Sequence, residues 1–241
     1  VVSSACSSSA KVFSSARRMM AAGLIDAAVV GGVDSLCLTT LYGFNSLGLI
    51  SDQVCRPFDA QRNGISIGEA AAFALLERTP EHLDADAVLL LGTGESSDAY
   101  HMSSPHPDGL GARMAMQDAL NMAGLKPSEI DYINLHGTAT QSNDAAECKA
   151  VQSVFGSGTP CSSTKGATGH ALGAAGGVEA VICALVLQHG LLPAGLNTRQ
   201  LDPALDLDYL LDNREQPAAR VLSNSFGFGG TNCSLIFARA A

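Results

Sequence analysis

A cysteine near the beginning of the chain has the setting of a catalytic nucleophile. Cys6 lies in the small-residue run Ser4-Ala5-Cys6-Ser7-Ser8-Ser9. The apolar segment before it has the composition of a strand end, and helical spacing of apolar residues begins at Ser7, so a strand-to-helix junction is predicted at Cys6. Small neighbours let other backbone come close, and a helix N-terminus favours a thiolate. A buried structural cysteine has the same local pattern, so the assignment depends on partner residues.

Two histidines and a lysine could be those partners. His136 follows the apolar segment 132–135 and precedes Gly137-Thr138-Ala139-Thr140, where side chains can project into a cleft. Lys165 and His170 lie five positions apart across a glycine-containing turn that opens a long apolar helix. Taken singly, the first pattern also fits a core histidine and the second an anion-binding helix start. Their joint presence with a cysteine indicates nucleophilic catalysis assisted by imidazoles.

A glycine-rich segment near the end of the chain could stabilise an oxyanion. Residues 226–232 read Phe-Gly-Phe-Gly-Gly-Thr-Asn, and such glycines leave backbone N–H groups accessible. The apolar runs 220–225 and 233–237 on either side predict the two strands of a hairpin. The segment is therefore either part of a catalytic site or a tight turn.

The elements that must position these residues alternate between strand and helix. Apolar periodicity predicts helices over residues 7–22, 108–123, 143–155 and 170–189, a helical turn near 39–46, and strands over 27–33, 68–78, 87–91, 132–135 and 161–163. Asn143 or Asp144 is the predicted cap of the third helix. The strands 68–78 and 87–91 are expected to neighbour one another in a sheet. The predicted class is α/β with stacked layers and a domain boundary near residue 80.

Composition excludes several classes of function. The 241 residues are 46% hydrophobic and 15% charged, as in a globular protein with a sizeable core. A net charge of −9 argues against nucleic acid and acidic membranes as partners. Seven cysteines without a CxxC pair fit neither a disulfide framework nor a zinc site. Runs such as 88–91 and 181–187 are too short to span a bilayer, so a cytoplasmic protein is expected.

The ordered motifs resemble those of the β-ketoacyl-acyl-carrier-protein synthases of fatty-acid and polyketide assembly. The resemblance is carried by Ser4-Ala5-Cys6-Ser7, Arg56-Pro57-Phe58-Asp59, His136-Gly137-Thr138, Ser163-Thr164-Lys165 through Gly169-His170, and Asn224 through Asn232. It implies a thiolase-like fold with α-β-α-β-α layers built from two related halves, and a homodimer. Members of the family carry a further long stretch before the nucleophile. We therefore expect residues 1–80 to end the first half and residues 81–241 to form the second.

The resemblance also implies a reaction and its catalytic residues. Cys6 would take an acyl group from a phosphopantetheine thioester, with the backbone N–H groups of Cys6 and Phe228 as the oxyanion hole. His136 and His170 would promote decarboxylation of malonyl-acyl-carrier protein and stabilise the enolate that attacks the acyl group. Lys165 would organise the histidines.

The remaining implied roles concern support and binding. Glu147 would be the ionic partner of Lys165, Thr138 and Thr140 would hold the pantetheine arm, and Phe228 would also gate the acyl pocket. No metal and no resident cofactor are implied, because phosphopantetheine arrives on the acyl carrier protein.

Carrier docking and three alternative readings remain open. The segment 164–170 is more similar to stand-alone synthases than to the modules of large polyketide enzymes. The loop 45–54 carries no basic residue, so docking of the carrier would fall to Arg17, Arg18, Arg56 or Arg62, or to the stretch before the nucleophile. The alternatives are a thiolase or chalcone-synthase-like enzyme, a non-catalytic chain-length partner, and an inactive fragment. The presence of Cys6 and of two histidines argues against the first two.

Overall fold

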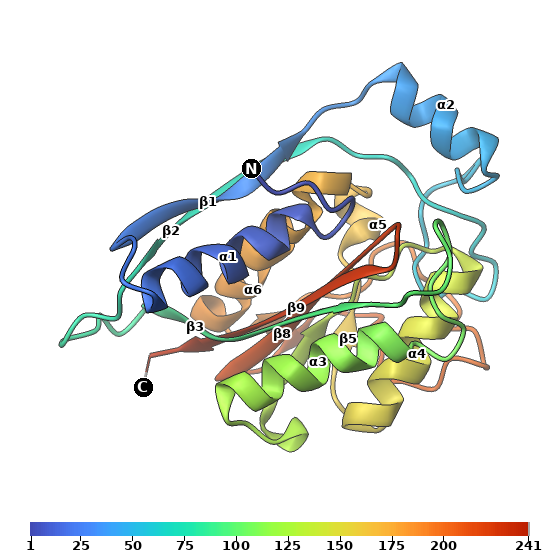
Figure 1. Cartoon of the computed structure of the whole chain (residues 1–241). Coiled ribbons are helices and arrows are strands. Elements are labelled where there is room, and N and C mark those ends of the chain that lie inside the picture. Colours follow the sequence, from blue (N-terminus) through green and yellow to red (C-terminus); the bar gives the residue numbers. More distant parts are fainter. Residues whose placement is uncertain (241) are drawn as a thin grey trace.

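Two sheets and two helical layers stack in the computed structural model, which describes residues 1–240 (Figure 1). Strands β1 (Ala27–Asp34) and β2 (Ala70–Glu77) form a two-stranded antiparallel sheet. Beneath it lie helices α1 (Ser8–Ala21) and α6 (Ala175–His189), which also pack on a five-stranded sheet. Helices α3 (Leu110–Ala123) and α4 (Gln141–Phe155) cover the far face of that sheet. The α/β class with stacked layers is confirmed, and residues 1–240 form four of the five layers expected.

The five-stranded sheet carries most of the predicted site at one end. Its order is β3-β9-β8-β4-β5, with bounds Val88–Ser97, Thr231–Arg239, Arg220–Gly227, Tyr132–Asn134 and Cys161–Ser162. The strands β8 and β9 form the predicted hairpin, and β4 runs parallel to both β8 and β5. Parallel strands end at the same edge of a sheet, so the segments after β4 and β5 come together.

The prediction that strands 68–78 and 87–91 are neighbours is wrong. The strand β2 pairs with β1, whereas β3 pairs with β9 from Val88↔Arg239 to Ser97↔Thr231. The layer of α1 and α6 separates the two sheets, so each strand completes its hydrogen bonds with a partner distant in sequence. Adjacency along the chain is a tendency, and burial of the helical layer between two sheets overrides it here.

Each helical layer forms its own apolar core with the five-stranded sheet. One core contains Met116, Leu120 and Ile133 on the α3–α4 side, and the other contains Phe13, Leu187 and Val221 on the α1–α6 side. At Gly94 of β3 there is no room for a side chain. A Cβ atom there would lie 1.9 Å from the carbonyl oxygen of Ala115. Close contact between α3 and the sheet therefore requires glycine at position 94.

Two predicted helix starts differ from the structure. The helix α4 is capped by Thr140, whose hydroxyl accepts a hydrogen bond from the Asn143 N–H at 3.3 Å, and not by Asn143 or Asp144. The last long helix begins at Ala175 rather than at His170. Residues 170–174 instead form a bridge between His170 and Ile67 and a short 3-10 turn (Leu172–Ala174). The remaining short elements are α2 (Leu38–Ser46), η1 (Pro127–Glu129), α5 (Lys165–Thr168), β6 (Leu191–Leu192) and β7 (Arg214–Glu215).

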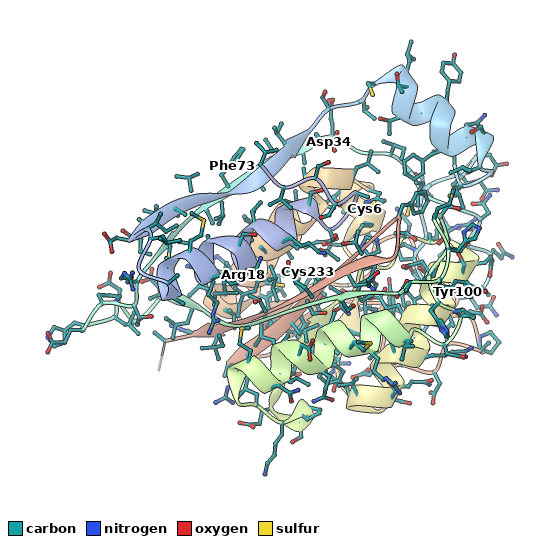
Figure 2. The ribbon with its side chains drawn as sticks, in the orientation of Figure 1. Cys6, Arg18, Asp34, Phe73, Tyr100 and Cys233 are labelled. Atoms are coloured by element: carbon teal, nitrogen blue, oxygen red, sulfur yellow. The ribbon has the colours of Figure 1, made fainter. Side chains whose placement is uncertain are left out.

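Two parts of the structure are notably apolar, one long segment and one exposed sheet face. The segment Leu172–His189 is long and apolar enough to cross a membrane by length and composition, although half of it is buried against the rest of the protein. The outer face of the β1–β2 sheet is exposed, with Val29 at 74% and Phe73 at 57%, and Figure 2 shows Phe73 directed away from α1. The boundary predicted near residue 80 falls between β2 and β3 and stays a prediction.

Candidate active site

The predicted nucleophile lies at the start of α1 on a tight turn. Cys6 is 5% exposed (Figure 2). Ala5 before it has a φ of 50°, a left-handed conformation that is uncommon for residues other than glycine. The hairpin turn between β8 and β9 lies against it. A Cβ atom on Gly227 would be 2.8 Å from the carbonyl oxygen of Ser4 and 3.1 Å from the nitrogen of Cys6. The glycine therefore allows the turn to approach the nucleophile.

Both predicted histidines meet at the same cavity as Cys6. The rings of His136 and His170 are 5.2 Å apart and nearly perpendicular, at 82°, and each residue is 2% exposed. His136 follows β4, and Phe226 of β8 lies against its ring at 5.7 Å. The His170 N–H donates to the Ser66 carbonyl at 2.7 Å, which fixes the backbone at the entry of the apolar helix. Cys6, His136 and His170 line one cavity.

Burial overrides the expected thiolate character of Cys6. Desolvation raises the pKa of the Cys6 thiol to about 11, although the Lys165 ammonium and a hydrogen bond from the backbone N–H of Phe228 oppose the rise. The helix N-terminus alone predicted a lowered pKa, and that expectation is wrong because the sulfur is enclosed. The contact between Phe228 and the sulfur places one N–H group of the predicted oxyanion hole at the nucleophile.

Lys165 is paired with Glu179, and not with Glu147 as predicted. The Lys165 ammonium donates to the Glu179 carboxylate and to the carbonyl oxygen of His136 at 2.6 Å. The Glu147 carboxylate instead accepts hydrogen bonds from the backbone N–H groups of His136 and Gly137, both at 2.8 Å. Its carboxylate holds the backbone of the histidine loop, and burial raises its pKa to about 7.

Glu179 was missed because nothing local marks it as a partner of Lys165. It lies on α6, whose residues are otherwise apolar or small as far as Leu187, and its side chain is 4% exposed. A single acidic residue within an apolar helix is costly to bury without a cation, and this is the signal that could have identified it. Only the packing of α6 shows that Lys165 is the cation.

Lys165 and burial together set the state of the two imidazoles. Desolvation and the nearby Lys165 charge hold the pKa of His136 and of His170 well below the usual value of 6.5, so both rings are neutral near pH 7. The ammonium lies 3.4 Å from Nδ1 of His136. Because an ammonium group can only donate, Nδ1 accepts and Nε2 carries the proton. His136 is therefore a neutral hydrogen-bond donor.

The remaining predicted residues line the same cavity. The hydroxyls of Thr138 and Thr140 lie 3.0 Å apart on its wall. The ring of Phe228 stacks on Phe44 of α2 with centroids 5.4 Å apart, and both rings border the cavity. Their roles in holding pantetheine and in gating stay predictions.

One arginine proposed for carrier docking is buried. The Arg62 side chain is 2% exposed and pairs with Asp144 at 3.5 Å and Asp202 at 2.7 Å, so it cannot dock a partner. Arg18 is more than half exposed and pairs with Glu95 at 2.6 Å. Within residues 1–240, no group of three or more His, Cys, Asp or Glu side chains could hold a metal ion.

Comparisons with known proteins agree on one family. Residues 1–82 match the model of the β-ketoacyl synthase N-terminal domain, and residues 87–199 match that of the C-terminal domain. The chain is 41% identical to the mitochondrial 3-oxoacyl-[acyl-carrier-protein] synthase of Arabidopsis thaliana, over 97% of this chain and 55% of that protein. It is also 41% identical to 3-oxoacyl-[acyl-carrier-protein] synthase 2 of Rhizobium meliloti, over 99% of this chain and 60% of that protein.

Solved structures show the same similarity. A chain in the complex of the ketosynthase ApeO with its chain length factor ApeC from Xenorhabdus doucetiae is 49% identical, with a TM-score of 0.94 over 99% of this chain and 59% of that chain. A β-ketoacyl synthase from Burkholderia phymatum is 37% identical, with a TM-score of 0.93 over 100% of this chain and 61% of that chain. The chain thus spans between 55% and 61% of the length of these relatives.

Proposed function

Because the chain belongs to the β-ketoacyl synthase family, we propose that it catalyses the decarboxylative condensation of an acyl-enzyme with malonyl-acyl-carrier protein. The observation that carries the proposal is the convergence of Cys6, His136 and His170 on one cavity. Lys165 contacts His136 from the protein interior. This contact sets which ring nitrogen of His136 carries the proton.

The first half of the reaction is transfer of the acyl group to Cys6. The sulfur of Cys6 attacks the carbonyl carbon of the acyl thioester, and the carbon–sulfur bond to pantetheine breaks. The N–H groups of Cys6 and Phe228 stabilise the oxyanion formed on the way. Since the pKa of Cys6 is about 11, the thiol proton must leave as the new bond forms. The neutral imidazole of His170 can take this proton and pass it to the departing pantetheine sulfur.

The second half forms the carbon–carbon bond. The malonyl carboxylate leaves as CO2, and its bonding electrons become those of an enolate at the thioester. His136, through its Nε2–H, and His170 donate hydrogen bonds to the enolate oxygen. Neutral rings can do this because each carries one N–H group. The enolate carbon then attacks the acyl carbonyl, the carbon–sulfur bond to Cys6 breaks, and the departing thiolate takes up one proton from water. The product is a β-ketoacyl thioester that is two carbons longer.

The wider setting forms part of the proposal. The partners are an acyl carrier protein and a second copy of the chain in a homodimer, because the relatives are named for the carrier and the family resemblance implies a dimer. No cofactor is resident, because the carrier brings the phosphopantetheine. The net charge of −9 and the cysteine pattern support a cytoplasmic protein that does not bind nucleic acid or membranes.

Mass spectrometry of the two half-reactions tests the proposal. We expect a hexanoyl-carrier thioester to acylate the wild-type protein at Cys6, and addition of malonyl-carrier to release a β-ketoacyl product. The Cys6→Ala variant should form no acyl-enzyme, whereas His136→Ala should form it and fail to condense it. A wild-type protein that takes no acyl group would refute the proposal and favour a non-catalytic chain-length partner or an inactive fragment. Cerulenin, an epoxide that targets condensing-enzyme cysteines, provides an independent probe of Cys6.

A further inference from the structure

A second cavity adjoins the predicted nucleophile. It has a volume of about 630 Å³, within the range of about 300–1,000 Å³ that small-molecule sites have. Cys6, Phe44 and Phe228 line both this cavity and the one that holds His136 and His170. A group attached to the Cys6 sulfur therefore borders both cavities, so its chain can occupy the second while the histidines act in the first.

The chemistry of the second cavity suits an uncharged and apolar chain. Asp34 is the one charged residue among those of residues 1–240 that line it, and its carboxylate accepts a hydrogen bond from the Gly173 N–H at 2.9 Å. A carboxylate at the end of a bound chain would be repelled by this charge. The Ser46 hydroxyl is also bonded within the protein, because it donates to the carbonyl oxygen of Gly43 at 2.7 Å. Leu47 adds apolar surface to the same wall.

Helix α2 forms one wall of the second cavity with a single face (Figure 1). Thr40, Gly43 and Leu47 all line the cavity and follow one another along α2 at spacings of three and four residues. Such spacings place residues on the same side of a helix, one turn apart. Gly43 lies between the other two, so a side chain at this position would point into the cavity.

Neither packing nor backbone conformation requires a glycine at position 43. A Cβ atom there would meet no atom of residues 1–240 within 4 Å, and the φ angle lies outside the left-handed region. In the other helices, a Cβ atom on each glycine would lie 3.2 Å or less from another atom, as at Gly111, Gly166, Gly176 and Gly177. A glycine inside a helix lowers stability relative to alanine or leucine. What Gly43 provides is empty space on the cavity side of α2.

We propose that Gly43 is a specificity-determining residue, whose missing side chain leaves room in the second cavity for the distal carbons of an apolar acyl chain on Cys6. The inference rests on the proposed function, because the acyl-enzyme is what places such a chain at the sulfur. A larger side chain at position 43 would occupy the space that the end of a long chain needs. A short chain ends before it reaches this wall and is affected less.

Acyl transfer from carriers of different chain length tests the role of Gly43. Wild-type, Gly43→Ala and Gly43→Leu proteins are incubated with butanoyl-carrier and decanoyl-carrier thioesters, and acylation of Cys6 is followed by mass spectrometry. The ratio of decanoyl to butanoyl transfer rates should fall by at least about tenfold in Gly43→Leu and by less in Gly43→Ala. The exposed Gly158, where a Cβ atom would also meet nothing within 4 Å, provides the matched control, and Gly158→Leu should keep the wild-type ratio. An unchanged ratio in Gly43→Leu would overturn the proposal.

The wild-type rates and the unfolding temperature separate the possible failures. A wild-type protein that accepts neither acyl group would refute the proposed function and the role of Gly43 with it. A wild-type protein that accepts butanoyl but not decanoyl groups would overturn the role of Gly43 alone, because the space would then hold no chain. Since leucine favours a helix more than glycine does, Gly43→Leu should raise the unfolding temperature by about 2–4 °C. A lower unfolding temperature would show that the space beside Gly43 is not free, which also overturns the proposal.

Discussion

Removal of the Glu179 carboxylate leaves the Lys165 ammonium buried without its counter-ion. The two side chains are 4% and 2% exposed, so water cannot replace the lost partner. Breaking one side of a buried pair costs about 3–5 kcal/mol, a large part of the total of about 5–15 kcal/mol for a domain. We expect Glu179→Leu and Lys165→Met each to destabilise the protein by that amount. The double variant removes both charges and should lose far less than the sum, with a coupling of about 3 kcal/mol or more.

Urea unfolding of the four proteins measures this coupling. The chain has no tryptophan, so helical circular dichroism is the suitable signal. The exposed pair Lys149–Asp108, at 3.1 Å with side chains 54% and 74% exposed, is the control, and its cycle should give less than about 1 kcal/mol. Single-variant effects for Lys165 and Glu179 that add within about 0.5 kcal/mol would refute the reasoning, because they would show that the two charges do not compensate one another.

Four further predictions concern the cavity and its supports. Alkylation of Cys6 by iodoacetamide should accelerate about tenfold per pH unit from pH 7 to 9, since its pKa is about 11; a plateau below pH 8 would contradict this. The low pKa of His136 means that unfolding takes up a proton below pH 6.5, which destabilises the fold as the pH falls. His136→Gln should therefore reduce the slope of unfolding free energy against pH by about 1.4 kcal/mol per pH unit near pH 5, whereas the exposed His82→Gln should not; equal slopes would contradict the burial argument. Thr140→Val should cost about 1 kcal/mol in urea unfolding because it removes the cap of α4, and an unchanged midpoint would contradict that role. Gly227→Ala should slow acyl transfer to Cys6 in the mass-spectrometric assay, because its Cβ would lie 3.1 Å from the Cys6 nitrogen; a wild-type rate would show that the turn can move away.

The local elements were predictable because each depends on a short pattern. The helix starting after Ser7, the strand β1 and the hairpin of β8 and β9 all follow the expected ranges within a few residues. The positions of Cys6 and His136 at element ends followed from the same patterns, and the structure brings both to one cavity with His170. Glycine positions such as Gly227 were visible as turn signals, but their role in close approach was not, because the atoms that approach come from other segments.

The errors share one physical origin. The partner of β3, the cation paired with Glu179 and the pKa of Cys6 all depend on contacts between segments far apart in the chain. Glu147 and Glu179 are both acidic residues on helices, and only the packing decides which carboxylate holds backbone N–H groups and which meets Lys165.

The sequence by itself determined the types of element and the positions of Cys6 and His136 at element ends, because spacing and residue chemistry are local properties. The tertiary structure alone decided which groups are enclosed and which atoms face them. Enclosure raises the pKa of Cys6 and lowers that of His136. Desolvation and pairing depend on the surroundings in space, which residues adjacent along the chain do not specify.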